Sequence, residues 1–288
     1  MIRKFLILPI LLLSFHFIAN CGQLDTIETP SKLTGAEFLA GQHHWLIPFG
    51  ENGIVLSQPS SSFFVYFLSL FYLYVGYKFW VSIRSQKSRY FWAMGFFLTG
   101  IAAILAGTSY QALGYELKCT GRDFCLWTTW WEINYEILQN AGMNGFLAAA
   151  AYTNAKASLR KILLGYAILN TFVYSSLVIY GAIVPIQFLV SFEFLELSCL
   201  PAVIFFLFSS AYGYFTKKDK MNFHLLITWI LLVFVMFAYA VSLEMNLTSL
   251  LWTKGIWFTE NDVLHVGLIL WVYYILKTLV TYVKDERE

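Results

Sequence analysis

The sequence predicts an all-α integral membrane protein that folds as a bundle of seven membrane-spanning helices. Hydrophobic residues make up 59% of the chain and charged residues only 12%, which leaves too little polar surface for a soluble globular protein. Seven apolar segments of about spanning length follow one another, and the loops between them are short. The net charge of +2 provides no basic surface of the kind that nucleic acid requires, so we expect no nucleic-acid partner.

The N-terminus has the pattern of a targeting segment. Arg3 and Lys4 precede an apolar stretch, 5–19, that is shorter than the roughly 20 residues a span needs. We interpret residues 1–20 as a signal peptide, with a short uncleaved anchor of the same orientation as the alternative. The run that ends at Cys21 resembles a bacterial lipobox, in which this cysteine would be lipidated, so we expect a bacterial inner membrane with the N-terminus on the extracytoplasmic side.

Residues 21–61 are polar and loop-like, and several prolines and glycines interrupt them. We expect an extracytoplasmic lead that is too short for a core of its own. The membrane bundle then occupies residues 62–283, and residues 284–288 form a cytoplasmic tail. The seven spans are expected at 62–83, 90–113, 127–152, 162–182, 184–213, 223–243 and 257–283.

The distribution of basic residues predicts the orientation, because cytoplasmic loops carry an excess of Lys and Arg. With the lead outside, the inner loops and tail hold eleven basic residues and the outer loops hold four. The N-terminus is therefore expected outside and the C-terminus inside. The inner residues are Arg84, Lys87, Arg89, Lys156, Arg160, Lys161, Lys217, Lys218, Lys220, Lys284 and Arg287, and the outer ones are Lys32, Lys118, Arg122 and Lys254.

Two cysteines lie in the loop after the second span. Cys119 and Cys125 are separated by a short segment that includes Gly121, so a turn can bring them together. In an oxidising compartment they would form a disulfide. The alternative, two thiolates that bind zinc, lacks further Cys or His residues nearby.

Polar side chains recur in the outer halves of spans two, three, five and seven. An ionisable side chain inside a membrane costs several kcal/mol unless it faces the bundle interior, a partner or water. We therefore expect these side chains to converge on one polar site. They are Ser109, Gln111, Glu132, Glu136, Glu193, Glu196, Asp262 and His265.

So many acidic groups could not all stay ionised in a medium of low dielectric constant without compensation. Bound protons or a divalent metal would compensate them, and the ligand types suit magnesium, calcium, manganese, zinc or iron. Protonated carboxyl groups that hydrogen-bond between helices are the purely structural alternative. The metal ligands would be His265, Asp262 and Glu136.

The arrangement resembles the seven-span superfamily that includes alkaline ceramidases, progestin and adiponectin receptors and GPI-anchor remodelling hydrolases. That pattern has Ser and His four residues apart in span two, an acidic residue early in span three, and two His four apart in span seven. Ser109, Glu132 and His265 match three of these positions. Leu113 and Ile269 stand where the other two histidines belong, so a three-histidine zinc site cannot form.

The resemblance implies a metal-assisted hydrolase that acts on lipid amide or ester bonds. Ser109 would lie near the oxyanion, Asp262 or Glu132 would act as base or metal ligand, and Gln111, Asp262 and Glu136 could replace the missing imidazoles as oxygen ligands. The partner would be a membrane lipid that enters sideways. Two other classes stay open, a non-catalytic lipid-binding or signalling bundle and a proton-linked transporter.

Overall fold

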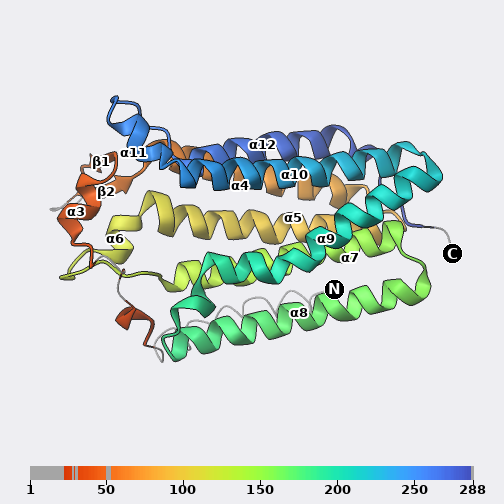
Figure 1. The fold of residues 1–288 in the computed structure, drawn as a ribbon, viewed down its shortest axis with the longest axis horizontal. Coiled ribbons are helices and arrows are strands. Elements are labelled where there is room, and N and C mark those ends of the chain that lie inside the picture. The colour runs from red at the N-terminus through yellow and green to blue at the C-terminus, as the bar shows by residue number, and fades with distance from the viewer. Residues whose placement is uncertain (1–22, 28, 30–31, 50–52, 287–288) are drawn as a thin grey trace.

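The computed structural model describes residues 23–27, 29, 32–49 and 53–286, and most of these residues are helical. The predicted signal peptide and Cys21 lie outside this range. Long helices run side by side along one direction (Figure 1). They are α4 (Pro59–Val81), α5 (Lys87–Ala106), α7 (Trp130–Asn154), α8 (Ala157–Ile183), α9 (Phe192–Lys217), α10 (Lys220–Glu244) and α12 (Glu260–Lys277).

Six segments are long and apolar enough to cross a membrane, so the chain is a multi-pass membrane protein. Their outward faces expose large apolar side chains, such as Phe67 on α4, Phe172 on α8, Phe208 on α9 and Phe234 on α10. Exposure of so large an apolar surface to water is unfavourable, whereas its contact with lipid is not. Helix α7 is equally long but is less apolar, since it carries two glutamates and several asparagines, most of them buried. The six segments are Pro59–Val81, Lys87–Ala112, Ala157–Ile183, Phe192–Lys217, Lys220–Glu244 and Glu260–Tyr282.

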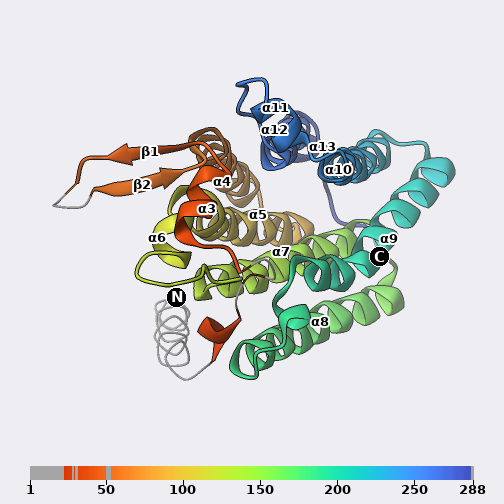
Figure 2. The same cartoon turned by 60° about the vertical axis from the view of Figure 1, so that its left-hand side comes forward.

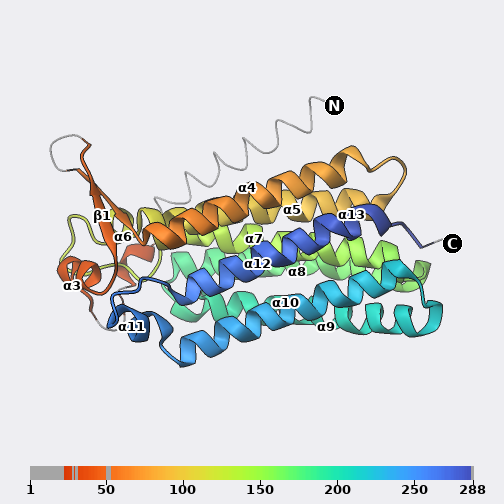
Figure 3. The ribbon, with the colours of Figure 1, turned by 90° about the horizontal axis from the view of Figure 1, so that it is seen from above.

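Short elements gather at one end of the bundle, which we call the hairpin end (Figures 1 and 3). The strands β1 (His44–Ile47) and β2 (Ile54–Ser57) pair antiparallel, with His44 opposite Ser57 and Ile47 opposite Ile54. They project sideways from the bundle (Figure 2). The remaining short elements are η1 (Leu24–Thr26), α3 (Gly35–Ala40), the π-helix η2 (Gly107–Ala112), α6 (Gly114–Lys118), η3 (Gln187–Val190), α11 (Leu247–Trp252) and, at the opposite end, α13 (Leu279–Tyr282).

Cys119 and Cys125 form a disulfide directly after α6. Both cysteines are buried, and the loop reverses at Gly121, whose φ of 74° suits glycine. The lead is held against this loop by backbone hydrogen bonds, because Cys125 N donates to Leu33 O at 2.8 Å and Trp127 N donates to Ile27 O at 2.9 Å. The disulfide therefore fixes the segment on which the lead packs.

The core of the bundle is a cluster of buried aromatic rings. Trp229 of α10 stacks on Phe206 of α9 with ring centroids 3.8 Å apart, and it lies 5.8 Å from Trp92 of α5. Phe146 of α7 lies 5.1 Å from Trp92 and 6.4 Å from Trp271 of α12. These rings therefore join five helices near the middle of the bundle.

Helices α5 and α7 approach closely because glycines face each other between them. A Cβ atom on Gly142 would lie 2.6 Å from Thr99 Cγ2 and 3.2 Å from the backbone oxygen of Gly95, and the backbone cannot give way. We expect Gly142→Val to lower the free energy of unfolding by about 1 to 3 kcal/mol, as overpacking usually does. Gly165→Ala in α8 is the control, since a Cβ there meets nothing within 4 Å. Thermal unfolding in detergent should show a lower midpoint for Gly142→Val alone, and equal midpoints would contradict this packing.

The fifth predicted span begins later than expected. Residues 184–191 form a turn with η3, and α9 starts at Phe192, where the Ser191 hydroxyl accepts a hydrogen bond from Phe194 N and caps the helix. Glu193 and Glu196 therefore lie in the first two turns of α9 and are exposed, instead of lying about 14 to 18 Å inside a span. The apolar run is therefore not one helix from its start. Pro185 disfavours an α-helix there, and the capping serine starts α9 only at Phe192.

Candidate functional site

Ser109, Glu132 and Lys118 form a buried polar network at the hairpin end. The Ser109 hydroxyl donates to Glu132 Oε1 at 2.7 Å and lies 2.8 Å from Thr129 Oγ1. Lys118 Nζ makes an ion pair with the same carboxylate oxygen at 2.7 Å. Ser109 and Glu132 are both fully buried, so the lysine is the counter-ion of a charge that lies away from bulk water.

Local structure explains why these three side chains meet. Helix α5 widens at its end into the π-helix η2, in which Leu113 N donates to Thr108 O, and this turn carries Ser109 inward. Helix α7 begins after Thr129 in an extended conformation, so Glu132 lies in its first turn. Lys118 ends α6 just before the disulfide.

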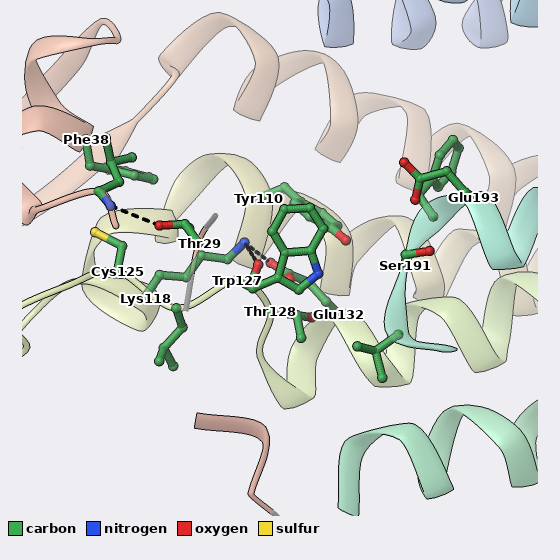
Figure 4. A pocket seen from close by; sticks show the side chains of 14 residues that line it. Thr29, Phe38, Tyr110, Lys118, Cys125, Trp127, Thr128, Glu132, Ser191 and Glu193 are labelled. Carbon is green, nitrogen blue, oxygen red and sulfur yellow. Dashed lines mark hydrogen bonds and ion pairs between the residues drawn. The ribbon is translucent and has the colours of Figure 1, made fainter. Parts of the chain in front are cut away.

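A cavity of about 310 Å³, the hairpin-end cavity, lies beside this network. Lys118, Glu132 and Thr128 line one side of it, and Ser191 and Glu193 line another (Figure 4). Within the described part of the chain, Glu132 Oε2 and the Thr128 hydroxyl have no hydrogen-bond partner. The remaining wall includes four aromatic rings, which belong to Phe38, Tyr110, Trp127 and Phe192.

A second and larger cavity, the interhelical cavity, lies between α7, α9, α10 and α12 and has a volume of about 540 Å³. Its walls are mostly apolar, with Leu232 and Leu268 among them, and Phe146 and Trp271 of the aromatic core also line it. Glu193 and Glu196 are its charged lining residues. The cavity is therefore amphipathic, with carboxylates near the hairpin end and rings toward the middle of the bundle.

The two cavities share Phe192 and Glu193 as lining residues. Glu193 lies in the first turn of α9 and belongs to the wall of both. The hairpin-end cavity and the interhelical cavity therefore adjoin at the start of α9. Figure 4 shows Glu193 and Ser191 on the side of the hairpin-end cavity opposite Lys118.

Glu136 lies one turn after Glu132 and is also fully buried. Its Oε2 accepts a hydrogen bond from the Tyr174 hydroxyl of α8 at 3.2 Å. The same face of α7 continues with Asn140 and Asn144, and both amides donate to Asn170 Oδ1 of α8. This part of α7 therefore serves as a polar contact between helices.

Asp262 has a different role from the one that the sequence suggested. Its carboxylate accepts a hydrogen bond from Thr259 N at 2.9 Å and completes a capping box at the start of α12. The same oxygen accepts from the Ser60 hydroxyl of α4 at 3.1 Å. Neither Asp262 nor His265, which is buried one turn later, lines either cavity. The expected convergence of Asp262 with the carboxylates of α7 and α9 is thus replaced by a contact between α12 and α4.

The predicted metal ligands are not grouped together in the described part of the chain. In the described ranges, no three His, Cys, Asp or Glu side chains are grouped so that they could hold an ion. Asp262 Oδ2 accepts from Thr259 N and Ser60, and Glu136 Oε2 accepts from Tyr174. Among the described residues, the other carboxylate oxygens and His265 Nδ1 have no partner, but they are not grouped around one point. The sphere of Asp262, His265 and Glu136 is therefore not assembled, and we derive no chemistry through a metal.

Gln111 and Lys118 are two further buried polar residues near Ser109 in the sequence. Gln111 is buried in η2, and its Oε1 has no partner among the described residues. Lys118 was expected only as an outer loop charge, yet it is the ion-pair partner of Glu132. A signal was present, because Lys118 directly precedes the disulfide that draws its loop back onto the bundle.

Comparison with protein-family models, with curated proteins and with solved structures gave no match. The resemblance to the ceramidase-like superfamily stays a prediction from Ser109, Glu132 and His265 alone.

Proposed function

We propose that the protein binds an amphiphilic membrane lipid, with its hydrocarbon chain in the interhelical cavity. The amphipathic character of this cavity carries the proposal, because apolar walls with a few polar groups at one end are typical of sites for such ligands. The lining of Leu232, Leu268 and Phe146 suits a hydrocarbon chain, and Glu193 and Glu196 suit a polar head. A chain from the surrounding bilayer would enter between helices.

The hairpin end would face the extracytoplasmic side of a bacterial inner membrane. Basic residues of the described chain gather at the opposite end, in the connections between α4 and α5, α7 and α8, and α9 and α10 and in the adjoining helix ends. The disulfide supports the same orientation, since such bonds persist in oxidising compartments.

A lipid with a photoactivatable group in its chain tests the proposal. Irradiation of the purified protein should give saturable labelling of peptides from α9, α10 and α12 that line the cavity, and excess unlabelled lipid should suppress it. Labelling of the outer face of α8, where Ile168 and Phe172 are exposed, should not saturate. Labelling that is equally insensitive to competitor on all helices would contradict the proposal.

Lipid hydrolysis is the second candidate, and the hydrogen bond between Ser109 and Glu132 favours it. A hydroxyl that donates to a carboxylate has the geometry of a nucleophile and its base. However, Ser109 is fully buried and lines neither cavity, and Lys118 pairs with the same oxygen of Glu132 that the Ser109 hydroxyl contacts. We therefore expect no release of fatty acid from labelled lipid esters or amides by the purified protein. Release that Ser109→Ala abolishes would establish the hydrolase instead.

A further inference from the structure

We infer that the ligand is an amphiphile with a primary ammonium head, which the hairpin-end cavity receives while the chain lies in the interhelical cavity. This inference rests on the proposed function and names the class of its ligand. Phe192 and Glu193 line both cavities, so a head in one cavity and a chain in the other would meet at the start of α9.

The hydrogen bonds around Glu132 show which head group fits. Its Oε1 already receives Ser109 and Lys118, whereas Oε2 has no partner within the described part of the chain. A buried acceptor without a partner is destabilising, and more so when it is charged. A ligand that donates a hydrogen bond to Oε2 would remove this cost. The neighbouring Thr128 hydroxyl, which also lacks a partner among the described residues, can accept a second N–H.

The charges of the lining residues favour a cation. Among the described residues that line the hairpin-end cavity, Lys118 is the single basic one, against the carboxylates of Glu132 and Glu193. Glu196 adds a further carboxylate in the adjoining wall. An ammonium group would balance this excess, and the rings of Tyr110 and Trp127 in the same wall can stabilise it further.

Because Glu132 Oε2 requires a hydrogen-bond donor, a primary ammonium head should bind more tightly than a quaternary one. A trimethylammonium head carries the same charge but has no N–H, so it leaves Glu132 Oε2 without a hydrogen bond. A hydroxyl head can donate but does not balance the charge. A carboxylate head adds to the excess of negative charge and should be excluded.

Four dodecyl probes test the inference on the full-length purified protein in a non-ionic detergent. We expect dodecylamine to bind at least about tenfold more tightly than dodecyltrimethylammonium or dodecanol, because a charge-assisted hydrogen bond is worth about 1.5 kcal/mol or more. Dodecanoate should bind most weakly. Equal affinities for all four probes would overturn the inference and leave the proposed function standing, whereas binding of none of them would refute the proposed function itself.

Variants of the lining residues test which side chains cause the preference for dodecylamine. Glu193→Gln should reduce the preference for dodecylamine over dodecanol. The double variant Lys118→Met, Glu132→Gln should abolish this preference, and it leaves no unpaired charge of this pair buried. Glu244→Gln, at the exposed end of α10, is the matched control and should keep the preference. A preference that persists unchanged in both cavity variants, or that is lost equally in the control, would overturn the assignment.

Discussion

Replacement of Lys118 by Met is expected to lower the free energy of unfolding by about 3 to 5 kcal/mol, because it leaves the carboxylate of Glu132 buried without its counter-ion. Glu132 is fully buried and the lysine side chain is only 11% exposed, so bulk water would solvate the unpaired carboxylate poorly. Lys118 Nζ lies 4.8 Å from the centroid of the Tyr110 ring, and Met keeps an unbranched side chain of similar length there without the charge. Chemical unfolding in detergent, followed by tryptophan fluorescence, measures the loss.

Lys217→Met is the matched control for this prediction. Lys217 makes an ion pair with Glu286 at the other end of the bundle, but its side chain is 40% exposed, and such pairs contribute less than about 1 kcal/mol. The double variant Lys118→Met, Glu132→Gln should recover most of the lost stability, since it removes the buried charge together with its partner. An equal loss for Lys118→Met and Lys217→Met would show that the pair at Glu132 is not a buried one.

Replacement of Leu268 by Trp is expected to weaken the binding of a dodecyl ligand by about tenfold or more. Leu268 lines the interhelical cavity, and the larger ring would displace at least two methylene groups of the ligand, each worth about 0.8 kcal/mol. The fold should persist, because the added volume goes into an existing space. Equilibrium binding of dodecylamine to the purified variant measures the effect.

Leu270→Trp provides the control on the same helix. Leu270 is 63% exposed on the outside of α12, where a larger ring contacts lipid instead of the cavity. Its binding of dodecylamine should equal that of the parent protein. A variant at position 270 that weakens binding as much as the variant at position 268 would place the ligand on the outer surface of the bundle.

The long helices were largely predictable from the sequence, because a helix that spans a membrane requires a long run of apolar residues. Side-chain partners were less predictable. Ser109 and Glu132 were expected at one site and do form a hydrogen bond, since each lies at the hairpin end of neighbouring helices. Glu193 was also expected near this site, and it lines the same cavity as Glu132, although its helix starts eight residues later than the apolar run.

Asp262 shows why the remaining part of the site was not predictable from polarity alone. Its position three residues from His265 suggested a shared functional face, but Thr259 stands three residues before Asp262, which is the spacing of a capping box. The carboxylate therefore satisfies the backbone of its own helix and the hydroxyl of Ser60. Whether such a carboxylate caps its own helix or contacts a distant residue depends on tertiary packing. The spacing of residues in the sequence does not show this packing.

The number of lipid molecules that the purified protein retains tests the central claim most directly. Native mass spectrometry of the parent protein after detergent exchange should show a single lipid-sized adduct per chain, and Leu268→Trp should remove it. A parent protein with no adduct, or a graded series of adducts that is identical in the parent and in Leu268→Trp, would contradict a lipid site between α7, α9, α10 and α12.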